Sequence, residues 1–146
     1  MPAAQLELEL TESHLMDNPS AAQQQVSRIK ALGVRIAIDD FGTGYSSLAY
    51  LKRFEIDKLK VDQSFVQGML DDRADAAIVH AVIALGHTLG LTVVAEGVEL
   101  LPTAQTLTAL GCDELQGYCF SRPLAVADFE QWVQAQRDAN ERRRAR

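Results

Sequence analysis

The sequence predicts an α/β protein whose strands run parallel and are linked by helices. Short stretches with the alternation or the β-branched composition of strands recur five times along the 146 residues. Longer segments with apolar side chains at helical spacing separate them, and this order implies crossover helices between parallel strands. A closed (β/α) barrel needs eight such units and about 250 residues. The chain therefore forms either a small open sheet or the later part of a barrel.

The first part of the chain predicts a strand, a helix and a second strand. Residues 6–12 alternate strictly between apolar and polar side chains, which is the period of a strand. Residues 20–32 carry apolar side chains at helical spacing and end before Gly33, a common helix stop. Residues 34–40 are rich in β-branched side chains and too few for a helix, so they predict a buried strand.

The middle of the chain repeats this order. Residues 48–54 predict a short helix, and residues 57–62 alternate like the first strand. Apolar side chains at helical spacing then predict a long helix over 75–90. Residues 91–96 predict another buried strand, which ends in a carboxylate followed by glycine.

The last part predicts a helix over 100–110, a short strand around 115–117 and a closing amphipathic helix over 127–136. Residues 137–146 contain five arginines and no apolar periodicity, so we expect a basic, frayed tail. The sequence thus predicts one domain over residues 1–136 followed by this tail.

The composition excludes several classes of protein. A hydrophobic content of 47% and a charged content of 23% are ordinary for a soluble globular protein, and no run is long enough to span a membrane. No signal-peptide pattern is present, and the six residues between Cys112 and Cys119 suit neither a CxxC motif nor a zinc pair. We therefore expect two buried free thiols in a cytoplasmic protein. The net charge of -6 argues against DNA as a partner but is compatible with a small phosphate ligand beside metal ions.

Polar side chains stand at or near the ends of the predicted strands, where parallel α/β folds gather their chemistry. They are Glu9, Asp39, Asp40, Lys60, Glu96 and Gln116. Alone, the two adjacent aspartates before a glycine-containing loop fit an Asx-turn as well as a metal site. Four carboxylates in one mouth would repel one another without cations, which favours one or two divalent metals acting on a phosphate ester. Below them, we expect Glu7 and Arg35 to pair within the sheet.

Five segments resemble successive motifs of the EAL domain, a family of bacterial phosphodiesterases for cyclic di-GMP. They are Glu-Leu-Thr-Glu-Ser (9–13), Asp-Asp-Phe-Gly-Thr-Gly-Tyr-Ser-Ser-Leu (39–48), Lys-Val-Asp (60–62), Ala-Glu-Gly-Val-Glu (95–99) and Gln-Gly-Tyr (116–118). The resemblance runs from about residue 6 to residue 124, with every motif in family order. It implies an incomplete TIM-like (β/α) barrel of the EAL type, of which this chain forms roughly the last five βα units.

The resemblance also implies a chemistry. In this family, two Mg²⁺ or Mn²⁺ ions in the barrel mouth activate a water that opens cyclic di-GMP to linear pGpG. The metal ligands implied here are Glu9, Asp39 and Asp40, with Asp39 as the bridge between the ions.

Four further residues take roles by the same resemblance. Lys60 resembles the catalytic residue that orients or activates the attacking water, and Glu96 resembles a member of the metal and water shell. Gln116 resembles a contributor to the substrate pocket. Glu12 resembles the glutamate that anchors the loop 41–47, which is linked in this family to metal binding and dimerisation.

Two family features are absent. The sequence lacks the Glu-Ala-Leu tripeptide, whose glutamate is a metal ligand, and the asparagine ligand of the next strand motif. We therefore expect the truncated, C-terminal part of an EAL domain, and an open barrel edge opposes turnover by this chain alone. A homodimer or another chain would supply the missing strands. The alternatives are an inactive regulatory module that binds cyclic di-GMP or a protein, and a non-functional fragment.

Overall fold

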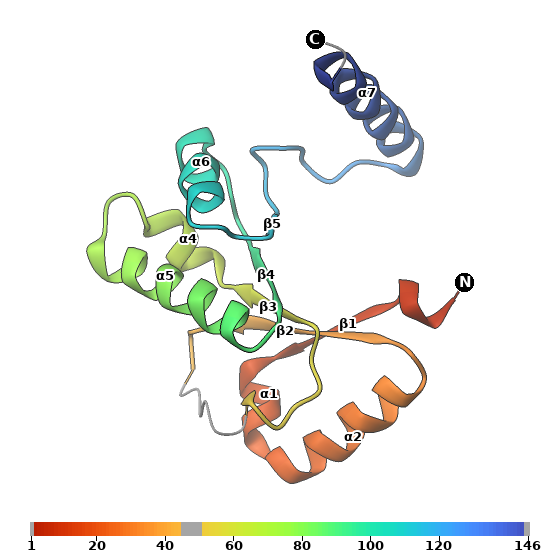
Figure 1. The fold of residues 1–146 in the computed structure, drawn as a ribbon, viewed down its shortest axis with the longest axis vertical. Helices are drawn as coiled ribbons and strands as arrows, with labels where there is room; N and C mark the ends of the chain where they lie inside the picture. The colour runs from red at the N-terminus through yellow and green to blue at the C-terminus, as the bar shows by residue number, and fades with distance from the viewer. Residues whose placement is uncertain (1, 45–50, 145–146) are drawn as a thin grey trace.

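The computed structural model describes residues 2–44 and 51–144 and confirms an α/β fold (Figure 1). Five parallel strands form one sheet in the order of the sequence. They are β1 (Glu7–Thr11), β2 (Arg35–Phe41), β3 (Lys58–Val61), β4 (Thr92–Ala95) and β5 (Glu114–Leu115). Each predicted strand is present, and adjacent parallel strands in sequence order are the arrangement of consecutive βα units in a barrel.

Helices lie between the strands, and one more follows the last strand. They are α1 (Glu12–Asp17), α2 (Pro19–Ala31), α4 (Gln63–Gly68), α5 (Arg73–Thr88), α6 (Leu101–Ala109) and α7 (Val126–Arg144), and a 3-10 turn, η1 (Ala3–Gln5), precedes β1. α2, α5 and α6 lie close to their predicted ranges. The side chains of Asn18 and Asp72 accept hydrogen bonds from N–H groups in the first turns of α2 and α5, which fixes where these helices begin.

Two helices were not predicted. α1 begins beside Thr11, whose hydroxyl accepts from His14 N at 3.4 Å, and α4 begins beside Asp62, which accepts from Ser64 N at 2.9 Å. Each has six residues, which are too few to show a helical period in the sequence. Of the helix predicted over 48–54, residues 48–50 lie outside the described residues, and 51–54 form a turn in which Phe54 N donates to Leu51 O at 3.3 Å.

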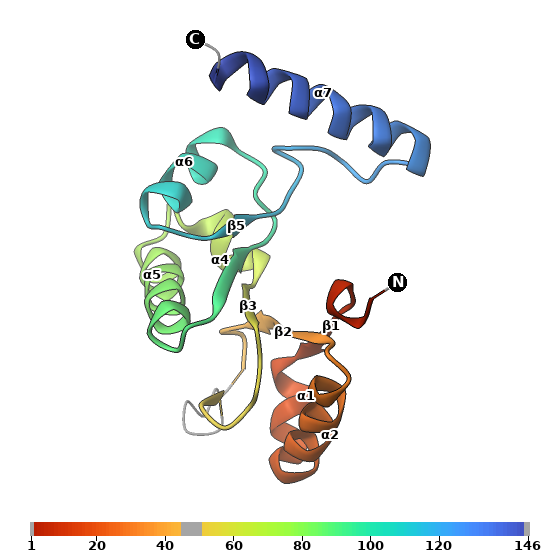
Figure 2. The same cartoon turned by 45° about the vertical axis from the view of Figure 1, so that its right-hand side comes forward.

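α7 is longer than predicted and lies apart from the sheet, after an extended segment (Figures 1 and 2). The helix predicted over 127–136 is present, and it continues to Arg144, into the segment that was expected to be a basic, frayed tail. The reason is local, because the segment is rich in helix-forming residues. Gln134 Nε2 also donates to Asp138 Oδ1 one turn later, at 2.8 Å. The division of the chain at residue 136 stays a prediction.

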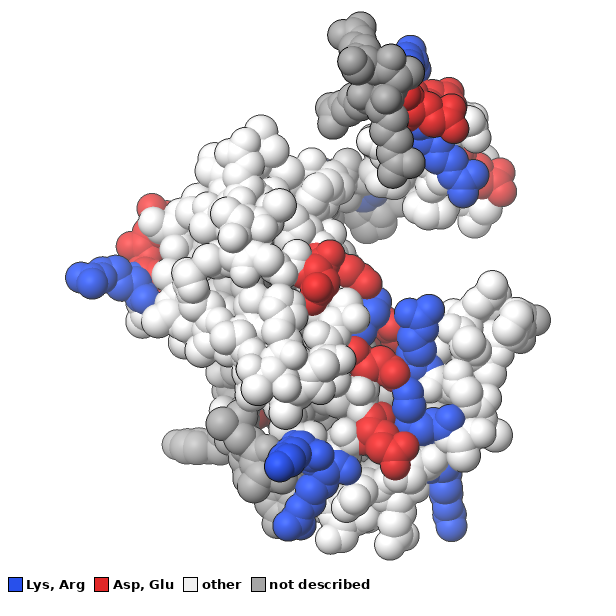
Figure 3. Space-filling model, in the orientation of Figure 1, with Lys and Arg blue, Asp and Glu red and all other residues white. Residues whose placement is uncertain are grey.

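The two faces of the sheet differ in chemistry. One face carries apolar side chains that pack against the helices, and Ile36, Leu59 and Val93 on it are fully buried. Burying each such side chain stabilises the fold by about 1.5–3 kcal/mol. The opposite face carries ion pairs between the strands, including those of Lys58 and Lys60. Figure 3 shows acidic and basic side chains alternating in one band across the molecule.

The predicted pair between Glu7 and Arg35 is wrong. The two residues are partners in the β1–β2 register, but Glu7 Oε2 lies 3.3 Å from Lys58 Nζ. Arg35 Nε instead donates to Ala4 O at 3.2 Å. Ala37 is the partner of Lys58 in the β2–β3 register, and its small side chain lets the long lysine cross β2 to reach β1.

Two aspartates, Asp57 just before β3 and Asp113 just before β5, each link the neighbouring strand to the helix that precedes that neighbouring strand. Asp57 Oδ2 accepts from Ile36 N at 2.8 Å and pairs with Lys30 Nζ at 2.6 Å. Asp113 Oδ2 accepts from Val93 N at 2.8 Å and lies 3.0 Å from His87 Nε2. The same arrangement, an aspartate that accepts a backbone N–H of a strand and pairs with a basic side chain of a helix, therefore occurs twice, at the amino ends of β2 and β4.

We expect Asp113→Asn to lower the free energy of unfolding at pH 7, because the ion pair with His87 is lost. The loss should not exceed about 1 kcal/mol, because both side chains of this pair are exposed to solvent. Burial by itself raises the pKa of Asp113, but the hydrogen bond from Val93 N and the pairing with His87 outweigh it, so the pKa lies below its usual range. The stabilisation is therefore complete above the unfolded-state pKa of about 3.9 and is lost as the pH falls through the lower folded-state value. Urea unfolding at pH 7 and pH 3 checks this, and an equal difference between the two proteins at both pH values would contradict it.

Both cysteines are free, as the sequence predicted, but each is half-buried and not fully buried. Among the helices that the structure describes, none is both long enough and apolar enough to cross a membrane.

Candidate metal centre

Lys60 lies at the centre of a carboxylate cluster near the carboxyl ends of the strands. Its side chain is only 6% exposed. Lys60 Nζ contacts Glu9 Oε1 at 2.7 Å, Glu96 Oε1 at 2.8 Å and Asp39 Oδ1 at 3.1 Å. These partners come from β1, β2 and the residue after β4, so four neighbouring strands meet at one ammonium group. A buried ammonium is costly unless it is paired, and three carboxylates offset that cost.

The protonation of Lys60 limits what it can do. Burial by itself lowers its pKa, but the hydrogen bonds to Glu9, Glu96 and Asp39 outweigh this and raise the pKa above its ordinary value. The side chain is therefore a charged hydrogen-bond donor at neutral pH. In this arrangement it can orient a water or a phosphate oxygen.

Three carboxylates could hold a metal ion. Asp39, Asp40 and Glu96 each offer one oxygen, and these oxygens all lie within 4.8 Å of one another. Oxygen donors at this spacing fit a hard divalent cation such as Mg²⁺ or Mn²⁺. Glu9, the remaining predicted ligand, lies outside this group of three and reaches Lys60 from β1.

Burial, together with the crowding of these carboxylates, raises the pKa of two of them. Burial is the main cause for Glu96, the nearby charge of Asp39 adds to it, and Lys60 opposes both. For Asp40, burial again comes first, followed by the charges of Asp39 and Asp62. A bound cation would relieve this repulsion, so the electrostatics of the group match its donor chemistry.

A bulge in β2 brings two adjacent aspartates to the same site. Successive residues of a regular strand point to opposite faces, so Asp39 and Asp40 would normally diverge. Here three steps of β2, from Ile38 to Phe41, run beside two steps of β3. Asp40 has the left-handed φ of 54°, and Asp39 Oδ1 accepts its N–H at 3.1 Å. Such strained residues gather at functional sites, and this one turns the second carboxylate back toward the first.

Glu12 holds the start of the loop after β2. It is 3% exposed, and its Oε2 accepts from Gly42 N at 3.1 Å. A Cβ at Gly44 would lie 3.3 Å from Glu12 Cδ, so the loop backbone packs directly on this carboxyl group. The structure thus places Glu12 against the loop that it was expected to anchor, for the part of the loop up to Gly44 that is described.

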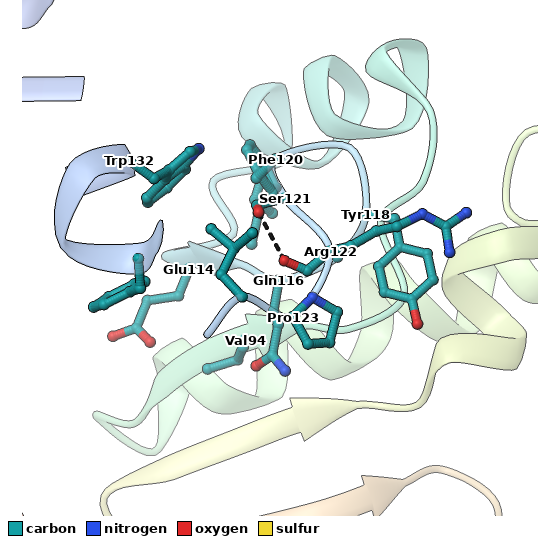
Figure 4. Close-up of a pocket in the computed structure, with 13 residues that line it drawn as sticks. Val94, Glu114, Gln116, Tyr118, Phe120, Ser121, Arg122, Pro123 and Trp132 are labelled. Carbon is teal, nitrogen blue, oxygen red and sulfur yellow. Dashed lines mark hydrogen bonds between the residues drawn. The ribbon is translucent and has the colours of Figure 1, made fainter. Parts of the chain in front are cut away.

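Gln116 lines two neighbouring pockets, a smaller and a larger hollow in the surface. The smaller one, of about 380 Å³, also touches Glu96, and three of its lining residues received no role from the sequence: Gln63, Glu99 and Tyr118. Glu99 and Tyr118 lie inside recognised motifs, which is the signal that could have singled them out. The larger hollow, of about 660 Å³, opens toward α7 (Figure 4). Figure 4 shows Gln116 between Trp132 of α7 on one side and Tyr118 on the other.

Comparisons with known proteins identify the family of this chain. The family model of the EAL domain matches residues 1–123. The Pseudomonas aeruginosa bifunctional diguanylate cyclase/cyclic di-GMP phosphodiesterase MucR is 50% identical over 117 residues, which are 80% of this chain and 17% of MucR. The cyclic di-GMP phosphodiesterase NbdA of the same species is 47% identical over 137 residues, which are 94% of this chain and 18% of NbdA. The chain thus spans less than a fifth of the length of these relatives.

Solved structures of the family match the fold. The MucR phosphodiesterase in complex with cyclic di-GMP aligns with a TM-score of 0.86 at 46% identity, over 88% of this chain and 52% of that one. The EAL domain of Mycobacterium smegmatis DcpA aligns with a TM-score of 0.84 at 39% identity, over 92% and 60%. The Klebsiella pneumoniae BlrP1 complex with manganese and cyclic di-GMP aligns with a TM-score of 0.78 at 38% identity, over 84% and 31%. This chain therefore belongs to the EAL domain family.

Proposed function

We propose that this chain carries metal-binding and catalytic side chains of an EAL phosphodiesterase and takes part in the hydrolysis of cyclic di-GMP to linear pGpG. The observation that carries the proposal is the cluster of Asp39, Asp40 and Glu96 beside the charged Lys60. The bound cyclic di-GMP in the MucR structure, which shares 46% identity with this chain, supports the substrate.

Asp39, Asp40 and Glu96 would hold a Mg²⁺ or Mn²⁺ ion, with Glu9 as a further ligand on the β1 side. When bound, such an ion lowers the pKa of a water and draws charge from the phosphate oxygens. The manganese in the BlrP1 complex supports this class of metal. The close approach of the three carboxylate oxygens of this chain supports it independently.

The other residues position the reactants. Lys60 donates hydrogen bonds toward the water and the phosphate, where its fixed charge favours the negative charge that develops as water adds to phosphorus and one P–O bond breaks. Gln116 borders the hollow beside Glu96 and would contact the substrate there. Glu12 fixes Gly42 and so keeps the bulge at Asp40 in place.

Strands from outside these 146 residues would close the barrel. The chain covers 52% of the MucR structure, and in the described sheet β1 and β5 each pair along only one edge. An unpaired strand edge exposes backbone N–H and C=O groups that another strand can satisfy. The Glu-Ala-Leu tripeptide and its metal ligand would come with those strands, from the same polypeptide, a second copy or another chain.

The experiment is an assay of cyclic di-GMP hydrolysis with Mn²⁺, in which linear pGpG is followed by chromatography. The purified chain is tested alone and after addition of a separate polypeptide that carries the first half of the MucR EAL barrel. We expect turnover only in the mixture. Turnover by the chain alone would show that no other polypeptide has to supply strands. The oligomeric state of the active chain would then reveal whether a second copy supplies them. No turnover in either sample would refute the proposed function.

A further inference from the structure

We propose that Lys60 competes with a divalent metal for the carboxylate cluster: its ammonium takes the place of a cation there, and it shifts toward the water and the phosphate when a metal binds. The side chain then acts as a built-in competitor that weakens the affinity of the site for divalent cations. This inference rests on the proposed metal-dependent function, because it concerns the same carboxylates.

The contacts of Lys60 carry the argument. Its ammonium lies 3.1 Å from Asp39 Oδ1 and 2.8 Å from Glu96 Oε1, and both residues belong to the group of three candidate ligands. A divalent cation bound to these residues would lie about 2.0–2.6 Å from their oxygens. Metal and ammonium would then be a few ångströms apart, and two cations at that separation repel each other, although the side chains of Asp39 and Glu96 are partly exposed, at 24% and 18%. A metal at these carboxylates and the present position of Lys60 therefore disfavour each other.

The charges of the cluster predict the direction in which removal of Lys60 changes stability and metal affinity. The four carboxylates of the cluster, Glu9, Asp39, Asp40 and Glu96, face one lysine. In the metal-free protein Lys60 offsets their repulsion, so its removal should destabilise the fold. With metal present, its removal should instead strengthen binding, because one positive charge leaves the site. A lysine with a purely structural role would not show these opposite effects.

Lys58 provides a matched control. It lies two residues before Lys60 on β3, faces the same side of the sheet and is also largely buried, with a side chain 13% exposed. Its partners are Glu7 Oε2 at 3.3 Å and Glu114 Oε2 at 2.8 Å, neither of which belongs to the carboxylate cluster. Replacing Lys58 removes the same charge from the same strand without freeing any candidate ligand.

The test is calorimetric titration of the 146-residue chain and its variants with MnCl₂, combined with thermal unfolding. We expect Lys60→Met to bind Mn²⁺ at least about tenfold more tightly than the wild type, and Lys58→Met to stay within about twofold of it. We also expect the melting temperature of Lys60→Met to be lower than that of the wild type without metal, and to rise more on addition of Mn²⁺. If Lys60→Met does not fold, Lys60→Gln replaces it, since the amide keeps hydrogen bonds but no charge.

The outcomes separate the inference from the proposed function. Equal or weaker Mn²⁺ binding by the Lys60 variants, with clear binding by the wild type, overturns the inference alone. An equal gain in affinity by Lys58→Met also overturns it, because the effect would then be one of net charge. No binding by the wild type or by any Lys60 variant overturns both the inference and the proposed metal-dependent function.

Discussion

Asp39→Asn is expected to lower the hydrolysis of cyclic di-GMP at least about a hundredfold, in whichever assembly of this chain turns over. Asparagine keeps the volume of the side chain, and its oxygen can still accept the hydrogen bond that Asp39 Oδ1 receives from Asp40 N at 3.1 Å. What is lost is one negative charge from the centre of the candidate metal group. Asp39 is also a partner of Lys60, so the variant loosens both the cation site and the donor beside it.

The same substitution should leave the fold intact. Burial is the first cause of the raised pKa of both Asp40 and Glu96, and the charge of Asp39 adds to it, so removing that charge relieves repulsion in the metal-free protein. We therefore expect an unchanged or higher melting temperature together with weaker Mn²⁺ binding. Asp71→Asn, at an exposed aspartate in the turn between α4 and α5, is the matched control and should behave like the wild type. Near-normal turnover by Asp39→Asn would contradict the role given to Asp39.

The sequence was sufficient for the order and type of the strands, because each is short and alternating or β-branched. It also predicted which residues lie near the strand ends. Alternation along a strand decides which face of the sheet a side chain is on, and its position in the strand decides how near the strand end it lies. Asp39, Lys60 and Glu96 meet in the structure for this reason.

The alternation of side chains along a strand did not predict contacts that depend on the length of a side chain or on an irregular backbone. Glu7 and Arg35 are neighbours in register, yet Glu7 pairs with Lys58 across the small side chain of Ala37. In a regular strand, Asp39 and Asp40 would point to opposite faces of the sheet. The bulge, with its left-handed φ at Asp40, brings both side chains to the same site. The motif around these aspartates predicted that both belong to one site, but it did not give the geometry.

Gly117→Ala is expected to cost about 3 kcal/mol or more of unfolding free energy, because an added Cβ would meet backbone atoms. It would lie 2.2 Å from Val98 O and 2.3 Å from Val98 N, far inside van der Waals contact. The backbone of Val98 cannot easily retreat. Its N–H donates to Gln116 O at 3.0 Å, its carbonyl accepts from Cys119 N at 2.9 Å, and the residue is fully buried.

Gly90→Ala is the control for this variant, since Gly90 has a φ of +72° but no atom within 4 Å of the point where an added Cβ would lie. Its cost should be that of the left-handed backbone alone, about 1 kcal/mol. Urea unfolding of both variants measures the difference. Equal costs would show that the Val98 segment yields, whereas a larger cost for Gly117→Ala would show that it is rigid. In the rigid case, the contact between Gly117 and Val98 holds together the two motifs that carry Gln116 and Glu96, so the glycine serves the site through the backbone.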